Sequence, residues 1–215
     1  MRPRLARSGV ALHNVYMCTH PDLAWPIAAA LRVVRSEGFD ALSMRRVADV
    51  AGMSTMAAYR HVADKGELVR QTIRAAFGLW ESRVYGVLDL GDPAERLERY
   101  AEVYLRFALE EPHLYDLLFI RPHDAGIHRY PDGFRERPAS TMKILQDAAA
   151  ELQTDPGDAE RDDPTEMAIG LWALVHGLVM IHRSGRFMGE GKTFEDLYRR
   201  RVRRAINRIR EGRTG

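Results

Sequence analysis

Residues 41–69 read ALSMRRVADVAGMSTMAAYRHVADKGELV, and this stretch decides the fold. Ser43 precedes the segment MRRVADVA, and its hydroxyl suits the N-cap of a helix over 44–51. Gly52 follows that segment, at a position where the left-handed conformation that ends many helices favours glycine. Ser54 then predicts the start of a second helix, over 55–62. Two short helices joined by a tight turn predict a helix-turn-helix.

The second of these helices has an unusual outer face. With a turn of about 100° per residue, Ala58 and Val62 share the inward face. The outward face then carries small, apolar and cationic side chains: Met56, Ala57 and Arg60. The two flanks carry hydrogen-bonding rings, Tyr59 and His61. Such a helix suits a DNA major groove, because its centre can meet base edges while its flanks meet phosphates.

The rest of the chain shows helical periodicity and no alternating strand pattern. Asp22 predicts the cap of a helix that Gly38 ends, and Asp64 predicts the cap of a long helix through 67–86. Further helices are expected near 93–110, 113–120, 134–153, 164–184 and 193–211. The predicted fold is all-α: an N-terminal three-helix DNA-binding domain (20–66) joined by a long helix to a larger helical bundle (67–213).

Composition favours a protein of the reducing cytoplasm. The single cysteine, Cys18, excludes an internal disulfide framework. The N-terminal residues are basic but lack a sustained apolar run, so no signal peptide is expected. The longest apolar stretch, 167–181, is shorter than the roughly 20 residues of a membrane helix, and we expect it to be a buried helix.

Charge is unevenly distributed along the chain. Residues 1–80 hold 11 basic and 6 acidic residues, whereas residues 81–198 hold 13 basic and 23 acidic ones. A basic N-terminal part on an acidic body suggests that the N-terminal part meets a polyanion. Chance unevenness is the alternative. The last 17 residues are also basic, and we interpret their arginines as a solvated helix face rather than a DNA contact.

Residues 41–69 resemble the DNA-binding domain of the TetR family of bacterial transcriptional repressors. The resemblance extends back to about residue 22. The matching positions occur in order and with the family's spacing: Leu42-Ser43, Val47-Ala48, Gly52, the pair Tyr59-x-His61, Lys65 and Leu68.

The resemblance implies a DNA-binding regulator, expected to be a repressor, whose partner is a palindromic double-stranded operator. Arg45 would contact DNA at the groove edge, and the base-reading positions are Thr55, Met56, Ala57 and Arg60. The phosphate-contacting positions are Tyr59, His61 and Lys65. Met56 and Ala57 cannot hydrogen-bond bases through their side chains, so direct readout falls mainly to Arg60, Arg45 and Thr55. Apolar contact with thymine methyl groups remains open.

The helix expected near 164–184 carries two features. Trp172, His176 and Gly177 resemble the Trp-His-Gly motif of one class of C-terminal domain within the family. Small side chains also recur along one stripe, at Gly170, Ala173, Gly177 and Ser184. Such a stripe allows close helix packing, either within the chain or across a homodimer seam. The family implies a homodimer, with Val202 and Ile206 of the last helix also at the interface, which would supply two recognition helices for two half-sites.

A pocket for a small apolar or aromatic effector is expected in the larger domain. The candidate lining residues are Trp80, Tyr104, Phe107, Tyr115, Phe119, Met142, Trp172, His176 and Met180. Aromatic and methionine side chains at helical spacing also form ordinary core. His176 is either the polar group that orients the effector or a core histidine with its hydrogen bonds satisfied.

Two other functional classes are weighed against this interpretation. A helical enzyme is disfavoured because no phosphate loop or nucleophile elbow is present. His123, Asp124 and His128 share a loop, and His176 and His182 share a helix, but neither set has clean metal-ligand spacing. We therefore expect no catalytic residues, no cofactor and no metal. A helical protein-interaction module without DNA binding is the second alternative, and a salt-dependent gel shift would discriminate the two.

Overall fold

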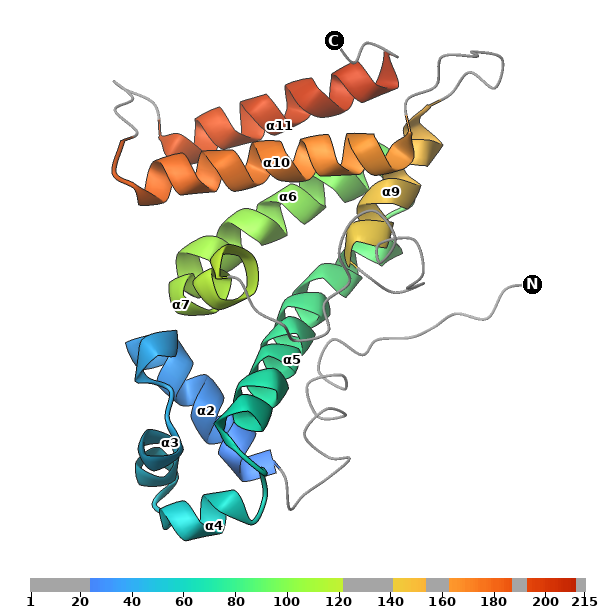
Figure 1. Ribbon diagram of the computed structural model, residues 1–215. Coiled ribbons are helices and arrows are strands. Elements are labelled where there is room, and N and C mark those ends of the chain that lie inside the picture. The colour runs from blue at the N-terminus through green and yellow to red at the C-terminus, as the bar shows by residue number, and fades with distance from the viewer. Residues whose placement is uncertain (1–23, 122–140, 154–162, 187–192, 212–215) are drawn as a thin grey trace, which may run out of the picture. The chain divides into compact units, whose positions relative to one another are not determined.

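The structure is a computed structural model that describes residues 24–121, 141–153, 163–186 and 193–211. These residues are all-helical, as the sequence predicts (Figure 1). The chain forms two compact units: Met1–Arg83 with Leu109–Ile127 (the first unit), and Val84–Ala108 with His128–Gly215 (the second unit). The first unit therefore includes most of the long helix that the sequence-based boundary at residue 66 assigned to the second domain.

The first unit contains the helix-turn-helix. Its helices are α2 (Ala24–Glu37), η1 (Phe39–Ala41), α3 (Met44–Ala51), α4 (Thr55–Tyr59) and α5 (Lys65–Val84), followed after a break by α7 (Pro112–Tyr115) and the π-helix η3 (Asp116–Ile120). Helix α2 packs against α3 and α7, and α3 packs against α4. The apolar side chains enclosed between these helices include Ala29, Val33, Leu42, Val47 and Leu68.

Local chemistry sets the helix ends that the sequence predicts. The Ser43 hydroxyl accepts a hydrogen bond from the Arg46 amide at 3.2 Å and caps α3. Gly52 ends α3 with φ 68° and ψ 30°, a left-handed conformation that costs glycine little. Gly38 follows α2 with φ 85°. Asp22 lies outside the described residues.

Glu111 joins three elements of the first unit. Its side chain is only 10% exposed, and the Arg35 guanidinium of α2 donates to both carboxylate oxygens, with Nε 2.8 Å from Oε2. Arg83 of α5 donates to the same carboxylate at 3.2 Å and to Glu110 at 2.8 Å. The hydrogen bond to Glu111 raises the pKa of the Arg35 guanidinium. One carboxylate thus ties the end of α2 and the end of α5 to the start of α7.

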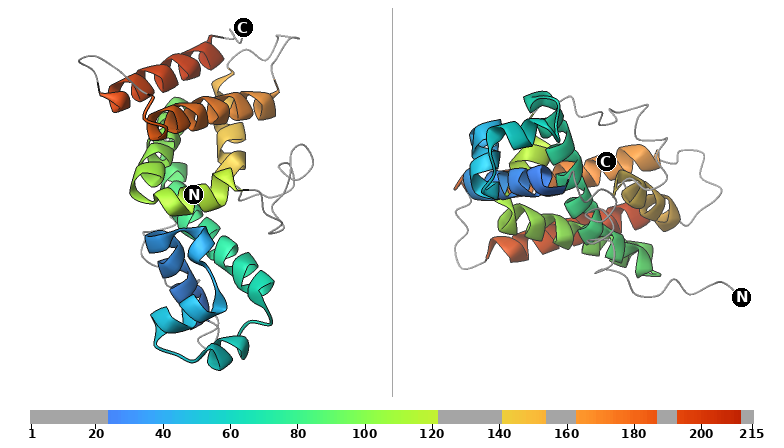
Figure 2. Two further views of the ribbon diagram at one scale, coloured as in Figure 1. Left: turned by 60° about the vertical axis from the view of Figure 1, so that its left-hand side comes forward. Right: turned by 90° about the horizontal axis from the view of Figure 1, so that it is seen from below.

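The second unit is a helical bundle. It contains η2 (Tyr85–Asp89), most of α6 (Pro93–Glu110), α9 (Thr141–Leu152), α10 (Pro164–Arg183) and α11 (Phe194–Arg210). Helix α10 packs against α9 on one side and α11 on the other (Figure 2). The Tyr198 hydroxyl of α11 donates to the Ala101 carbonyl of α6 at 2.7 Å. Arg199 binds Glu102 and lowers the pKa of that carboxyl.

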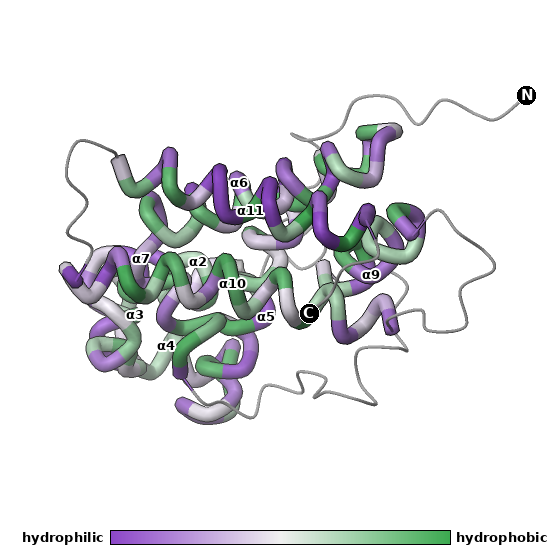
Figure 3. Tube along the Cα trace, turned by 90° about the horizontal axis from the view of Figure 1, so that it is seen from above, coloured by the Kyte–Doolittle hydropathy of each residue, from purple (hydrophilic) through white to green (hydrophobic). Residues whose placement is uncertain are grey.

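Helix α10 is less enclosed than expected. By length and composition it is the one described helix that could cross a membrane, and a third of its apolar window is buried. Figure 3 shows a largely hydrophobic α10 beside a largely hydrophilic α11. The expectation of a buried helix therefore holds for one face, and the other face leaves Ile181 49% exposed.

Several expected helix bounds differ from the structure. The helix over 93–110 is confirmed, whereas the segment 113–120 divides into α7 and the π-helix η3. The helix expected over 134–153 is described from Thr141, because 122–140 lie outside the described residues. Helix α4 ends at Tyr59, three residues before the predicted end.

Replacing Glu111 with glutamine should loosen α2. The variant removes the charge that two arginines share, and a charge-assisted hydrogen bond contributes about 1.5–3 kcal/mol. We expect a loss of about 1–3 kcal/mol in the opening free energy of α2 amides, measured by hydrogen exchange. Asp40→Asn is the control, because Asp40 binds Arg121 at 2.5 Å with its side chain 82% exposed, where a pair contributes about 0–1 kcal/mol. Equal losses in the two variants would contradict the role given to Glu111.

Candidate functional site

Helix α4 is held in place by its N-cap and by its inward face. The Ser54 hydroxyl accepts a hydrogen bond from the Ala57 amide at 3.2 Å. Ala58 and Val62 are buried, which confirms the predicted inward face. The side chains of Met56, Tyr59 and Arg60 are exposed, as predicted.

Ala57 is an exception to the predicted outward face. Its relative exposure is 5%, so its placement on the outward face is wrong, while its role in reading bases stays a prediction. Helix α4 is only five residues long and lies against α3, so a short methyl side chain at its edge is covered. Thr55, in contrast, is half-exposed and remains available.

The two flanking rings differ in their surroundings. Tyr59 is 49% exposed at the end of α4. His61 lies beyond the end of the helix, and its ring meets the Trp25 ring of α2 edge-on with centroids 5.6 Å apart. The Trp25 contact fixes the position of His61, which leaves the imidazole half-exposed.

The start of α5 presents a cation beside a capped helix end. Asp64 Oδ1 accepts a hydrogen bond from the Glu67 amide at 2.7 Å, which confirms Asp64 as the cap. Glu67 accepts hydrogen bonds from Gln71 and Arg70, and these lower the pKa of its carboxyl. Lys65 is exposed in the first turn.

Two arginines adjacent on α3 behave differently. Arg45 is exposed. Arg46 binds Glu37, with Nη2 2.7 Å from Oε1, and this hydrogen bond lowers the pKa of the Glu37 carboxyl. Arg45 therefore suits an external anion, while Arg46 ties α3 to the end of α2.

Sequence reasoning missed two residues of this surface. Met53, in the turn, is 47% exposed beside α4. Trp25 orients His61 from α2, far away in the sequence. An apolar residue in a tight turn after glycine could have drawn attention to Met53, whereas no local pattern identifies the Trp25 contact.

The second unit contains a polar contact among its aromatic residues. The Tyr104 hydroxyl lies 2.8 Å from His176 Nδ1, and the Trp172 ring centroid lies 5.9 Å from that of His176. Burial lowers the pKa of the His176 imidazole, so the neutral form is favoured. The histidine takes part in a hydrogen bond inside the bundle.

The nine effector candidates fall into two sets, each within one unit. Trp80, Tyr115 and Phe119 belong to the first unit, where the Phe119 ring lies 5.6 Å from Trp80 and 5.3 Å from Tyr115 between centroids. The second unit holds the other six: Tyr104, Phe107, Met142, Trp172, His176 and Met180. Five of the nine are buried, and Phe119, Trp172, His176 and Met180 are half-exposed.

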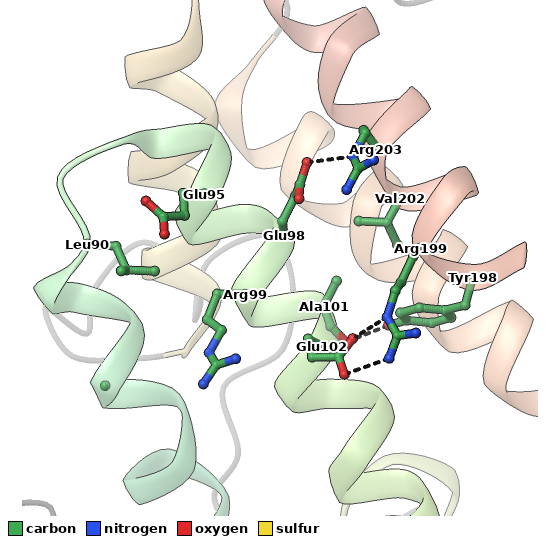
Figure 4. A pocket seen from close by; sticks show the side chains of 11 residues that line it. Leu90, Glu95, Glu98, Arg99, Ala101, Glu102, Tyr198, Arg199, Val202 and Arg203 are labelled. Atoms are coloured by element: carbon green, nitrogen blue, oxygen red, sulfur yellow. Dashed lines mark hydrogen bonds and ion pairs between the residues drawn. The ribbon is translucent and has the colours of Figure 1, made fainter. Parts of the chain in front are cut away.

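A hollow of about 490 Å³ in the second unit is lined by none of these nine residues. It lies among η2, α6 and α11 and is edged by ion pairs (Figure 4). Arg203 donates to Glu98 at 3.3 Å, and Arg199 donates to Glu102 at 3.1 Å. Because charged side chains make up much of its lining, the hollow offers an apolar effector little contact.

The proposed dimer residues divide between α10 and α11. Val202 and Ile206 of α11 are buried within the chain, and their assignment to a seam between copies stays a prediction. The apolar stripe of α11 turns inward, where Tyr198 is bonded to α6. Gly170, Ala173 and Ser184 are exposed, and Gly177 is half-exposed. A Cβ at Gly170 or Gly177 would meet no atom within 4 Å, so close packing within the described chain does not explain these glycines.

The described residues contain no group of three or more histidine, cysteine, aspartate or glutamate side chains placed to hold a metal ion. His176 and His182 are described, whereas His123, Asp124 and His128 lie outside the described residues.

Comparison with protein families assigns both parts of the chain. Residues 27–72 match the family model described as "Bacterial regulatory proteins, tetR family". Residues 97–205, about half of the chain, match the model described as "Tetracyclin repressor-like, C-terminal domain". The first match includes the whole helix-turn-helix.

A curated relative supports the N-terminal match. The HTH-type transcriptional repressor DrrR1 of Streptomyces coeruleorubidus is 49% identical over 43 residues. The match covers 20% of this chain and 16% of that repressor, so this relative informs the helix-turn-helix segment alone.

Solved structures share the fold over most of the chain. The structure of AibR in complex with isovaleryl coenzyme A and operator DNA is 21% identical with a TM-score of 0.58, covering 84% of this chain and 96% of that one. The structure of a TetR variant from Acinetobacter baumannii AYE in complex with minocycline is 17% identical with a TM-score of 0.57, covering 88% and 97%. These structural similarities show that the chain has the same fold as the two proteins.

The second unit should lose stability as His176 becomes protonated. The pKa of His176 is lowered from 6.5 in the folded chain, so the unfolded chain binds the proton more readily. The neutral imidazole then contributes its full stabilisation above about pH 6.5, and the free energy of unfolding falls as the pH drops below that value. We expect the melting temperature to fall more between about pH 7.5 and pH 5.5 in the parent than in His176→Gln. The same fall in both proteins would contradict the assignment of His176 as a histidine that is neutral in the folded chain.

Proposed function

Because the chain belongs to the TetR family of bacterial regulatory proteins, we propose that it is a cytoplasmic repressor that binds a palindromic operator as a homodimer and is released by a small effector. The observation that most directly supports this proposal is the set of side chains exposed on the outer face of the helix-turn-helix. The buried Ala58 of α4 and the buried Val62 just after it fix the orientation of this segment. Its exposed side chains include Arg60, and no carboxylate occurs between residues 50 and 63.

Each exposed group suits a different part of duplex DNA. Arg60 and Arg45 can donate to base edges, Thr55 can donate or accept, and Met56 can contact apolar groups. The remaining exposed or half-exposed groups, Tyr59, His61 and Lys65, are suited to phosphate oxygens. Lys65 lies in the first turn of α5, where the helix dipole also favours an anion.

Two variants separate base reading from phosphate binding. Arg60→Ala should weaken binding to the preferred duplex by about 1–3 kcal/mol and relax base preference. Lys65→Ala should weaken all sequences alike and reduce the slope of log affinity against log salt by about one unit. Binding would be measured by fluorescence anisotropy at several salt concentrations.

Arg204→Ala is the matched control, because Arg204 is an exposed arginine of α11, which is not part of the helix-turn-helix. Its affinity and salt slope should equal those of the parent. If Arg204→Ala changed the affinity and the salt slope as much as Lys65→Ala does, any surface cation would contribute equally to DNA binding. The assigned DNA-binding surface would then be wrong.

The outer face of α10 supports the homodimer. Gly170, Ala173 and Gly177 offer small side chains, with room for another helix to approach, and the exposed Ile181 continues the apolar face. Two-fold pairing would supply the two recognition helices that a palindrome needs. We also propose that Trp172, His176 and Gly177 form the Trp-His-Gly motif of this helix.

Gly177→Leu should weaken the dimer. A Cβ at Gly177 meets no atom of the described chain within 4 Å, so we expect the cost to arise mainly against a second copy, and overpacking typically costs about 1–3 kcal/mol. Analytical ultracentrifugation should show a shift toward monomer with unchanged helical circular dichroism. Gly86→Leu is the control, because a Cβ there also meets nothing within 4 Å. An unchanged dimer in Gly177→Leu would place the seam elsewhere.

A small apolar or aromatic effector is the proposed signal. The solved structures of AibR with isovaleryl coenzyme A and of the Acinetobacter baumannii TetR variant with minocycline show that proteins of this fold bind small molecules, which supports an effector. Within this chain, the half-exposed His176 and Trp172 can supply a polar group and an aromatic face. Helix α5 carries Lys65 at its start, so a change in its tilt would alter the spacing of two recognition helices that must lie about 34 Å apart.

Effector and operator binding should oppose each other. A coupling of about 1–3 kcal/mol would weaken effector binding by about 5–150-fold in the presence of operator, and operator binding by the same factor in the presence of effector. Isovaleryl coenzyme A and minocycline are the first probes, titrated by calorimetry with and without operator. A bound probe whose affinity is equal in both conditions would contradict the allosteric proposal and leave DNA binding intact.

A further inference from the structure

Met56 is the most exposed large apolar side chain of the described residues, at 74%. It lies on α4, in sequence between the exposed Met53 and Tyr59, whereas Ala57 and Ala58 are buried and Ser54 uses its hydroxyl as the helix cap. A thioether held outward by a short, capped helix is costly to leave in water, because apolar surface is stabilised by burial. Contact with an apolar partner would remove this surface from water.

The surroundings of Met56 decide what that partner is. Arg60 and Arg45 are exposed, Lys65 begins α5, and no carboxylate occurs between Asp49 and Asp64. An exposed apolar group on a segment that carries cations and no carboxylate over residues 50–63 fits a polyanion that carries apolar groups on its surface. In the major groove of DNA, the apolar group presented by the bases is the C5-methyl of thymine.

We propose that Met56 selects thymine at one position of each half-site by packing against its C5-methyl group. The inference rests on the proposed function, since α4 must enter the major groove. Methionine suits the contact because its unbranched, polarisable side chain adapts to an irregular surface. The same contact explains how a helix with few hydrogen-bonding side chains can still distinguish bases.

The test removes the methyl group from the DNA. A duplex is first selected from a random pool with the parent protein, and each thymine is then replaced singly by deoxyuridine, which lacks only that methyl. The parent should lose about fourfold in affinity at one symmetric pair of positions for each methyl removed, the equivalent of about 0.8 kcal/mol per buried carbon group. Replacement at the other thymines should have little effect.

Protein variants then assign the effect to Met56. Met56→Ala should bind the thymine and deoxyuridine duplexes equally at that position. Met56→Gln should shift the preferred base there to adenine, whose N6 and N7 pair with a carboxamide. Leu88→Ala is the matched control, because Leu88 is a 53% exposed apolar residue of η2, and it should retain the parent's fourfold ratio.

The outcomes separate this inference from the proposed function. A parent that binds a selected duplex with a steep salt dependence, but ignores every deoxyuridine substitution, overturns the role of Met56 and leaves the regulator proposal standing. A fourfold ratio that persists in Met56→Ala assigns the methyl contact to another side chain and also overturns it. Failure to select any duplex overturns both, and Met56 would then face a protein partner.

Discussion

A five-residue helix cannot hold itself together in water, and the proposed function depends on how α4 is held. Isolated helices shorter than about 12–15 residues are marginal even with favourable sequences. Helix α4 persists because Gly52 turns the chain in the left-handed region, Ser54 caps the first turn, and Ala58 and Val62 are buried. These contacts also fix which side chains face outward, so the chemistry offered to DNA follows from a turn, a cap and two small apolar contacts.

Glu111 supplies a second constraint, on the element that carries α4. Its nearly buried carboxylate binds Arg35 at the end of α2 and Arg83 at the end of α5. The helices that support the helix-turn-helix are therefore held in part by a residue that follows α6 in the sequence. Helix α6 contributes Tyr104 to the second unit and ends at Glu110 in the first. The helix that carries the hydrogen bond to His176 therefore continues directly to the residue that fastens α2. The proposed effector response would rely on this covalent continuity.

Local chemistry made much of this fold predictable, and tertiary contacts set the limit. The caps at Ser43, Ser54 and Asp64 could be predicted because each involves groups within three residues. Ala57 was misplaced because neighbours on α3, and not periodicity, decide whether a methyl group is covered. The stripe through Val202 and Ile206 was identified correctly as apolar, but a stripe does not state whether its own chain or a second copy covers it. The contact between Arg35 and Glu111 spans 76 residues and leaves no local signal.

The central claim is that two copies of α4 enter successive major grooves of one operator, and affinity cleavage tests it most directly. An iron chelate is attached to a cysteine introduced at Met53, which is exposed beside α4, with Cys18 replaced by serine. We expect two symmetric clusters of strand cleavage on the operator, with centres about one helical turn, or roughly 34 Å, apart. A single cluster, uniform cleavage, or the same pattern from a chelate placed at Leu88 would contradict it.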